Sequence, residues 1–432
     1  MLDLLDLRAF AGDLDEALPA PVDAPGPVDA VREIIAAVRS RGDAALRDLT
    51  AEFDGVVIDE IRVPADTVAA AWRETSPTLR AALAHAADAV RVYHEGQVVS
   101  PPQAERDGVA AHEVIVPVAA AGCYVPGGRA VYPSTVLMTA IPARVAGVER
   151  VVVCVPPGPG GTVPTPTLAA ASLAGADEVY RVGGAQAIAA LAYGTESIRP
   201  VDVVVGPGNV YVSLAKKAVV GQVGIDALAG PSEVAVVADD AADPEQVAAD
   251  LLAQAEHGPD GAAVLITWHE PLVAAVDAAI ARRLATAPRA AEIDAALRTG
   301  GRAILVTGPD AALDVVNVIA PEHLELLTTD AGALVPRVRN AGAVFCGPWT
   351  PAVVGDYMAG VNHVLPTART ARFASALRVD TFCKHIHVVR ADEAALRRMA
   401  PDITALADAE GLTEHARAVA LRVGSPVQER AS

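Results

Sequence analysis

The chain has 432 residues, of which 52% are hydrophobic but only 3% aromatic, so its apolar mass is mainly aliphatic. A chain of this length buries roughly three quarters of its unfolded surface and needs no disulfide or metal staples to fold. Its 53 acidic residues outnumber its 34 basic ones, and the net charge of −19 argues against binding to nucleic acid or to an anionic membrane surface, because both need clustered bases.

The cysteines and the first residues indicate a cellular compartment. Cys123, Cys154, Cys346 and Cys383 are far apart and form no C-x-x-C pair, so we expect neither a disulfide framework nor a cysteine zinc site. They fit a reducing cytosol. Residues 1–6 carry acids where a signal peptide carries bases, and no uncharged apolar stretch is long enough to span a membrane. We expect a soluble, cytoplasmic protein.

The spacing of apolar residues along the chain changes after about the first hundred residues. Residues 28–41 and 64–97 have apolar side chains at helical spacing, and Gly42 ends the first run. From about residue 114, short β-branched runs end in glycine and precede helices rich in Ala and Leu. These runs are 151–155, 178–184 and 201–206. Apolar strands that alternate with helices predict a parallel sheet covered on both faces.

A second set of strands and helices follows the first. It contains a predicted helix, 244–257, and four predicted strands, which are 233–238, 262–267, 303–307 and 343–346. After Pro366 the pattern returns to helix and ends with residues 405–422. The chain therefore predicts two α/β units in its middle.

Two strand-to-helix turns, residues 183–186 and 206–209, have the composition of ligand-binding turns. Ligands of open α/β sheets bind at the carboxyl ends of the strands, and a helix N-terminus offers N–H groups to an anion. Neither turn matches the dinucleotide fingerprint G-x-G-x-x-G, and the chain has no Walker A motif. A nucleotide site and a plain tight turn both remain open.

Cys123 precedes another glycine-rich turn, residues 124–129, and could act as a nucleophilic thiol in aldehyde oxidation. Its apolar surroundings, residues 119–122, argue against a low pKa. A small core residue is the favoured interpretation of Cys123.

Several polar side chains could form a metal or acid–base site. Gln254 and His257 lie three residues apart near the end of a helix that Asp243 caps, so they share one face and could bind a borderline metal. Glu322 and His323 offer two adjacent titratable groups. Asp356 and His363 lie in a later loop, and Glu410 and His415, five residues apart, are predicted to belong to the last helix. Taken one at a time, each of these residues is more often structural.

Taken together, the motifs closely resemble the histidinol dehydrogenase family over nearly the whole chain after the first twenty or so residues. The most specific are QAEHGPD (254–260), PEHLE (321–325) and NHVLPT (362–367) in this order. The others are YVPGGRAVYPSTVLM (124–138), VGGAQAIAALAYGT (182–195), VVGPGNVYV (204–212), AGPSEVAVVAD (229–239), GDYMAGVNH (355–363) and AEGLTEHARAVALRV (409–423).

The resemblance implies a zinc-dependent, NAD-linked oxidation of L-histidinol to L-histidine through an aldehyde. It assigns Zn²⁺ to Gln254, His257, Asp356 and His415, and the acid–base chemistry to Glu322 and His323. The zinc ligands and His323 would also contact the substrate. Further substrate contacts would be Ser232, His363 and Glu410, and the NAD contacts would be Tyr124, Gln186 and Asn209.

The resemblance also implies a fold and an assembly. It predicts an α/β protein with two incomplete Rossmann-like domains, parallel-sheet cores, and helical extensions at both ends. The expected segments are an N-terminal extension (1–24), a first domain that holds the metal and substrate site (25–123 and 235–377), a second domain on the NAD side (124–234) and a C-terminal helical extension (378–432). That extension would reach a second subunit, so that His415 and Glu410 serve the partner's active site in a homodimer.

The chain departs from the family pattern at two places beside Asp356. Residues 349–352 read Trp-Thr-Pro-Ala where the family usually reads Ser-Pro-Glu, and Val361 replaces a more usual Pro or Thr. Two other classes of protein remain possible. A cysteine-dependent aldehyde dehydrogenase would need Cys123 or Cys346 as an activated thiolate, and a two-lobed ligand-binding protein would share the α/β architecture.

Overall fold

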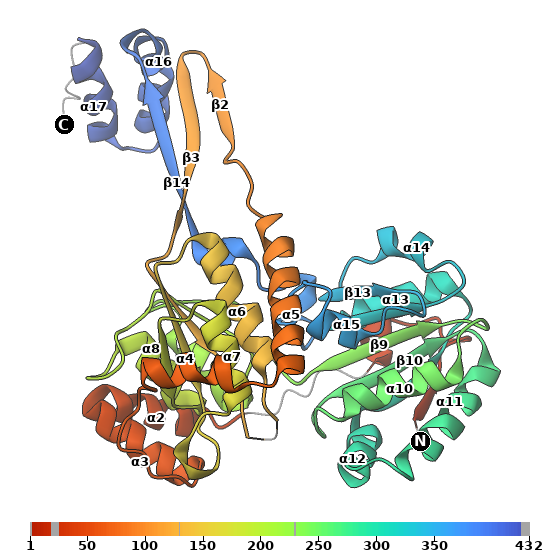
Figure 1. Ribbon diagram of the computed structural model, residues 1–432. Coiled ribbons are helices and arrows are strands. Elements are labelled where there is room, and N and C mark those ends of the chain that lie inside the picture. The colour runs from red at the N-terminus through yellow and green to blue at the C-terminus, as the bar shows by residue number, and fades with distance from the viewer. Residues whose placement is uncertain (1, 19–25, 129, 229, 425–432) are drawn as a thin grey trace. The chain divides into compact units, whose positions relative to one another are not determined.

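The computed structural model of the protein describes residues 2–18, 26–128, 130–228 and 230–424 (Figure 1). It divides the chain into two compact units. The first unit comprises Met1–Val98 and Val118–Phe382, and the second comprises Val99–Pro117 and Cys383–Ser432. None of the helices in the described ranges has both the length and the hydropathy of a membrane span.

One sheet of the first unit has six parallel strands in the order β1-β11-β10-β9-β12-β13. Their bounds are β1 (Asp3–Asp6), β9 (Glu233–Ala238), β10 (Ala262–Thr267), β11 (Gly301–Leu305), β12 (His323–Leu327) and β13 (Ala343–Cys346). From β9 the chain adds β10 and β11 on one side and then crosses back to add β12 and β13 on the other. The strand order therefore reverses between β9 and β12, which makes this the topological switch point of the sheet.

Both faces of the six-stranded sheet are covered. Val234 and Val236 pack in one apolar cluster, which includes side chains of α10, α11 and α12, whereas Ala235 and Val237 pack in another, which includes side chains of α13. The helices are α10 (Pro244–Ala255), α11 (Glu270–Leu284), α12 (Ala290–Gly300) and α13 (Pro309–Ile319). This alternation along β9 explains why the strand is apolar at every position after Glu233.

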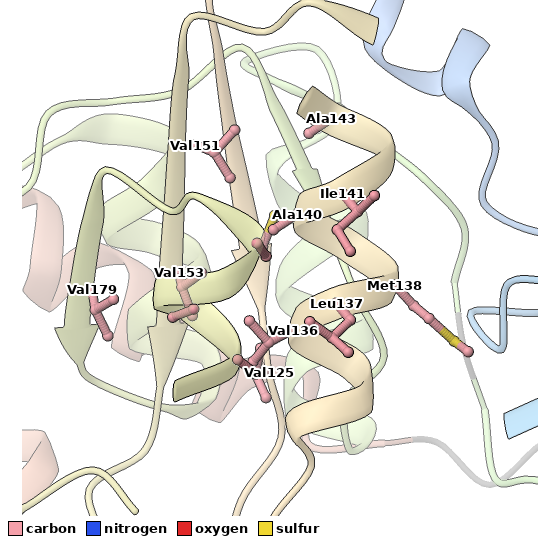
Figure 2. Packing of buried hydrophobic residues seen from close by; sticks show 14 of the residues in the cluster. Val125, Val136, Leu137, Met138, Ala140, Ile141, Ala143, Val151, Val153 and Val179 are labelled. Atoms are coloured by element: carbon pink, nitrogen blue, oxygen red, sulfur yellow. The ribbon is translucent and has the colours of Figure 1, made fainter. Parts of the chain in front are cut away.

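The other sheet of the first unit has five parallel strands in the order β6-β5-β4-β7-β8 and repeats the same winding. Its strands are β4 (Ala120–Tyr124), β5 (Arg150–Val155), β6 (Glu178–Arg181), β7 (Val203–Val205) and β8 (Gly224–Ile225). Its helices are α6 (Pro133–Ala146), α7 (Thr165–Ala174), α8 (Gly184–Tyr193) and α9 (Val210–Val219). Figure 2 shows Val136 and Ala140 of α6 on the side of the helix that faces Val153 of β5. The predicted fold class, with two incomplete Rossmann-like sheets, is confirmed.

The N-terminal helices cover the five-stranded sheet. They are α2 (Val28–Arg41), α3 (Asp43–Phe53), α4 (Ala65–Glu74) and α5 (Pro77–Glu95). Helix α2 packs on α8 and α9, α4 packs on α7, and α5 packs on α6. The structure thus groups these helices with a different sheet from the predicted domain of residues 25–123 and 235–377. A periodic pattern shows that a helix has an apolar face, but it does not show which sheet that face covers.

The two ends of the chain contain strands that the sequence pattern does not predict. Strand β1 pairs with β11 at the edge of the six-stranded sheet. In the second unit, β14 (Cys383–Ala391) pairs antiparallel with β3 (Val109–Pro117), and β2 (Gln103–Arg106) completes this three-stranded sheet. Helices α16 (Glu393–Ala409) and α17 (Thr413–Val423) follow and pack on each other. The C-terminal extension is therefore helical only after a long strand.

The remaining described elements are short. They are α1 (Leu14–Ala17), α14 (Ala331–Leu334), α15 (Ala352–Tyr357) and four 3₁₀ turns, Pro159–Gly161, Val335–Arg337, Thr370–Arg372 and Val379–Phe382.

Candidate active site

The candidate site lies at the amino ends of β9 and β12. His323 is the first residue of β12, Glu233 is the first residue of β9, and the register of the two strands places His323 opposite Val234. The predicted catalytic pair, Glu322 and His323, thus lies at the amino edge of this sheet, opposite the carboxyl edge at which open α/β sheets commonly bind ligands.

Hydrogen bonds fix the predicted pair against the start of β9. Nδ1 of His323 lies 3.1 Å from the carbonyl oxygen of Glu233. The carboxylate of Glu322 accepts from the backbone N–H of Glu233 at 2.9 Å and from the hydroxyl of Ser232 at 2.6 Å. Oγ of Ser232 also lies 3.2 Å from Oε1 of Gln254. The structure thus brings together four residues that the family resemblance assigns to the site: Ser232, Gln254, Glu322 and His323.

The imidazole of His323 has one free nitrogen. Because Nδ1 faces the Glu233 carbonyl, Nδ1 carries the hydrogen of the neutral ring and Nε2 is left as the basic nitrogen. Nε2 is buried, has no hydrogen-bond partner and lies 3.8 Å from Oδ1 of Asp356. Burial alone lowers the pKa of His323, but the carboxylates of Glu322 and Asp356 outweigh it and raise the pKa well above its usual value. The two carboxylates therefore stabilise the imidazolium that forms when Nε2 accepts a proton.

A cavity of about 30 Å³ lies beside His323. Its lining residues are Val234, Asp250, Ala253, Gln254, His257, His323, Glu325, Ala352, Val353 and Asp356. A space of this size holds a group as large as a water molecule or a metal ion. Three of the four predicted zinc ligands, Gln254, His257 and Asp356, line this one cavity, and they come from the end of α10 and from α15.

The donor atoms around the cavity fit a cation. Burial raises the pKa of Glu325 to about 8, and the neighbouring carboxyl of Asp250, whose own pKa burial raises, adds to this effect. Such crowding of buried carboxyl groups favours a compensating positive charge. Nε2 of Gln254 is buried without a partner, and turning this amide over would present its oxygen to the cavity instead. In the described part of the chain no three His, Cys, Asp or Glu side chains alone form a metal site.

Glu410 and His415 belong to the second unit. Glu410 is the C-cap of α16 and His415 lies in the first turn of α17, and both are exposed. Their predicted place beside the zinc of a partner subunit stays a prediction.

His363 lies in the loop after α15, and α6 holds it. Its Nε2 is 3.1 Å from Oγ1 of Thr135, and its backbone N–H donates to Sδ of Met138 at 3.3 Å. Burial lowers the pKa of His363 and so favours the neutral ring. The neighbouring Asn362 is buried and contacts the same helix.

The three predicted NAD contacts lie at the carboxyl edge of the five-stranded sheet. Tyr124 ends β4, and its hydroxyl accepts from the backbone N–H of Gly184 at 3.1 Å. Gln186 lies in the first turn of α8, with its Oε1 buried and unpartnered. Asn209 caps α9 by accepting from the N–H groups of Tyr211 and Val212. Here the expectation of a site at the carboxyl ends agrees with the positions of the predicted residues.

The turn at Gly206 requires glycine. Its φ is +114°, and a Cβ atom there would lie 2.1 Å from the carbonyl oxygen of Tyr124. The backbone of the turn therefore packs directly on the end of β4, which only a residue without a side chain permits.

Sequence patterns missed several residues that shape these sites. Asp250 and Glu325 line the cavity, and the backbone of Glu233 contacts the predicted catalytic pair. Lys216 and Asp226 form a buried ion pair beside Gly206. Asp250 could have been found, because it lies one helical turn before Gln254 on α10. The pairing of Lys216 with Asp226 has no local signature.

The cysteines do not favour thiol catalysis. Cys123 is buried in β4, and burial raises its pKa to about 12. Burial also raises the pKa of Cys154 and of the exposed Cys346. None of these three thiols has the lowered pKa of a catalytic nucleophile.

Comparisons with known proteins agree with the family that the motifs resemble. The family model described as histidinol dehydrogenase matches residues 22–423. The histidinol dehydrogenase of Parasynechococcus marenigrum is 50% identical over 93% of this chain and 91% of its own length, and that of Moorella thermoacetica is 51% identical over 91% and 93%. The crystal structure of histidinol dehydrogenase from Elizabethkingia anophelis matches with a TM-score of 0.93 and 34% identity, covering 98% of both chains.

Proposed function

The chain belongs to the histidinol dehydrogenase family, and on this basis we propose that it oxidises L-histidinol to L-histidine in two NAD-linked steps with the help of a bound zinc ion. At the coarser level, it is an oxidoreductase of histidine biosynthesis whose substrate is histidinol. The observation that carries the finer proposal is the buried, unpartnered Nε2 of His323, which faces a cavity lined by Gln254, His257 and Asp356.

The first step converts the alcohol to an aldehyde. Nε2 of His323 accepts the hydroxyl proton as the substrate carbon loses a hydride, so the substrate loses two electrons and two hydrogens. The Glu233 carbonyl holds the Nδ1 hydrogen and keeps Nε2 available, and the Glu322 and Asp356 carboxylates stabilise the imidazolium that forms. NAD would supply the hydride acceptor in each step.

The second step needs water. Glu322 would take a proton from a water molecule as the water oxygen adds to the aldehyde carbon, and the His323 imidazolium would return its proton to the aldehyde oxygen, which gives the hydrate and restores the neutral ring of His323. His323 then accepts a hydroxyl proton of the hydrate as the carbon loses a second hydride, which leaves the carboxylic acid. Ser232 and the Glu233 N–H hold the Glu322 carboxylate in one orientation for this role.

Gln254, His257 and Asp356 would hold the zinc ion, with His415 of a second copy as the fourth ligand. When bound, the ion would fix the substrate's nitrogen atoms and neutralise the surrounding carboxylates. The aldehyde must stay bound between the two oxidations, so substrate anchoring near His323 matters more here than in a single oxidation.

Tyr124, Gln186 and Asn209 would form the NAD side of the site. The unpartnered oxygen of Gln186 supports this assignment, because a buried polar atom normally has a partner. The turn at Gly206 brings backbone close to the same edge, and backbone N–H groups can hold a pyrophosphate without basic side chains.

The test of this proposal is NADH formation that depends on histidinol. Purified protein should reduce two molecules of NAD per histidinol and release histidine. Dialysis against a chelator should abolish the activity, and added zinc should restore it. Absence of NADH formation would refute the function, whereas full activity after chelation would refute only the zinc site. Mixing inactive His415→Ala and His323→Ala proteins tests the shared dimer, because exchange of subunits should regenerate one intact site per crossed dimer.

A further inference from the structure

Helix α6 carries a proline in its interior. Pro142 lies in the third turn of the helix Pro133–Ala146. Because proline has no N–H, the carbonyl of Met138, four residues earlier, has no donor within the helix. Met138 is 1% exposed, so solvent does not supply one. A buried carbonyl without a donor is costly, and α6 therefore needs a donor from elsewhere in the fold.

Asn362, in the loop after α15, supplies that donor. Its Nδ2 donates to the Met138 carbonyl at 2.6 Å and lies 3.4 Å from Nε2 of His94 on α5. Its Oδ1 accepts from the N–H of Val364 at 2.9 Å. Asn362 is 2% exposed, so these partners account for both ends of its amide. Asn362 thus donates to the Met138 carbonyl, which Pro142 leaves without a donor from the helix.

His94 contacts both α5 and the loop. Its Nδ1 lies 2.7 Å from the carbonyl oxygen of Val90, and its Nε2 lies 3.4 Å from Nδ2 of Asn362. Gly360 strengthens the contact with α5, because its backbone approaches so closely that a Cβ atom would lie 2.4 Å from the carbonyl oxygen of Ala89. The loop is thus bound to α5 and α6 together.

The residue after Asn362 is His363, which α6 also holds. The N–H of His363 donates to the sulfur of Met138, and Nε2 of His363 lies 3.1 Å from Oγ1 of Thr135. Figure 2 shows the Met138 side chain leaving α6 on the side away from Val153 and Val179. That side of α6 therefore contacts two consecutive loop residues through a carbonyl, a thioether and a hydroxyl.

The far end of the same loop is bound beside the catalytic pair. Oγ1 of Thr367 accepts from the N–H of Gly230, and the N–H of Ala368 donates to the Glu233 carboxylate at 3.0 Å. His363 thus lies between one attachment on α6 and another at the amino end of β9, where Glu233 contacts the catalytic pair.

We propose that Pro142 is a positioning residue for the reaction. By removing the helical donor of the Met138 carbonyl, it makes that carbonyl available to Asn362, and this bond keeps His363 in place beside the site. The inference rests on the proposed function, because it takes His363 to be a substrate contact. It adds a role for a helix-interior proline, which by itself destabilises a helix.

The decisive variant is Pro142→Ala, which returns an N–H to the Met138 carbonyl and competes with Asn362. We expect its midpoint of thermal unfolding to equal or exceed that of the wild type, because alanine suits a helix interior better than proline. We expect the KM for histidinol to rise about tenfold and kcat to stay within about twofold, as for the loss of one buried hydrogen bond. Pro77→Ala is the matched control, since Pro77 occupies the first position of α5 and removes no helical bond.

A double-mutant cycle tests the coupling without any assay of activity. Asn362→Ala should lower the unfolding midpoint of the wild type, because the Met138 carbonyl loses its donor. The same substitution in the Pro142→Ala protein should lower the midpoint clearly less, because the helix then satisfies the carbonyl itself. Equal losses in the two backgrounds, or an unchanged KM in a stable Pro142→Ala protein, would overturn the role of Pro142. A wild type that forms no NADH from histidinol would overturn the proposed function, and the cycle would still report whether Pro142 and Asn362 are coupled.

Discussion

Lys216 and Asp226 form a buried ion pair at the turn of residues 206–209. Nζ of Lys216 contacts Oδ1 of Asp226 and donates to the carbonyl of Gly206 at 3.1 Å, while Oδ2 of Asp226 accepts from the N–H of Gly206 at 2.7 Å. The side chains are only 2% and 4% exposed. The pair thus binds both the N–H and the carbonyl of Gly206. We predict that Lys216→Met destabilises the protein and weakens its binding of NAD.

The size of the effect follows from what the substitution leaves behind. Asp226 would remain a buried carboxylate without its counter-charge, which typically costs about 3–5 kcal/mol. We expect the lower half of this range, because the Gly206 N–H still donates to Asp226. The double variant Lys216→Met/Asp226→Asn removes both charges and keeps an oxygen for that N–H. It should lie within about 1–2 kcal/mol of the wild type.

Chemical denaturation of the three proteins measures these differences, and steady-state kinetics measures the effect on NAD. We expect Lys216→Met to raise the KM for NAD about tenfold and to change the KM for histidinol little, because Gly206 packs on the carbonyl of Tyr124. If the free energy of unfolding of Lys216→Met lies within about 1 kcal/mol of the wild-type value, the reasoning is refuted. The loss of the counter-charge of a desolvated carboxylate would cost more than that. A double variant no more stable than the single one would show that charge is not the cause.

Three further predictions concern the site. His323→Ala should lower kcat by about 10²–10⁴-fold and leave histidinol binding within several-fold, and a kcat equal to the wild type would remove His323 as the base. Gly206→Ala should lower the stability of the protein or raise its KM for NAD, because the new Cβ would lie 2.1 Å from the carbonyl oxygen of Tyr124. Wild-type stability and kinetics in this variant would contradict the structure. Thiol alkylation should modify the exposed Cys346 without loss of activity, and inactivation that histidinol prevents would revive the aldehyde dehydrogenase alternative.

The parts of the fold that the sequence predicts well have local causes. Helix α2 ends at Arg41 because Gly42 adopts a φ of +51°, and α10 begins after Asp243, whose side chain accepts from the N–H of Glu245. Strands β9, β10 and β13 have the predicted bounds, because unbroken apolar runs between turn residues predict strands buried on both faces. Each signal acts within a few residues of the element that it predicts.

The parts that the sequence does not predict depend on distant partners. Strand β14 is largely exposed and lacks the alternating burial of a half-buried strand, so its pairing with β3 leaves no pattern in residues 383–391. The predicted run 64–97 becomes two helices, because Ser76 caps α5 and Pro77 begins it. The sequence predicts this break only if the capping residues Ser76 and Pro77 are given more weight than the apolar periodicity that runs through them.

The candidate site shows the same division. Family motifs identify Ser232 and Glu322 separately, but their hydrogen bond joins residues ninety positions apart, and only the pairing of β9 with β12 brings them together. Asn362 and Met138 are 224 positions apart, and neither has a chemical signature of its own. Contacts of this kind follow from the fold, so sequence patterns alone do not reveal them.

The candidate site lies at the amino edge of the six-stranded sheet, and the opposite edge of the same sheet holds a buried carboxylate. At the carboxyl ends of β9 and β12, the carboxylate of Asp239 accepts from the N–H of Thr329 at 2.8 Å and from the N–H of Ala241 at 3.0 Å. Asp239 is 6% exposed, so a buried carboxylate bonded to the backbone lies at the carboxyl edge, where open α/β sheets commonly bind ligands. The amino ends instead carry Glu233 and His323, whose free Nε2 faces the cavity. The two sheets have the same winding, yet the proposed NAD contacts lie at the carboxyl edge of the five-stranded sheet and the proposed acid–base pair lies at the amino edge of the six-stranded sheet.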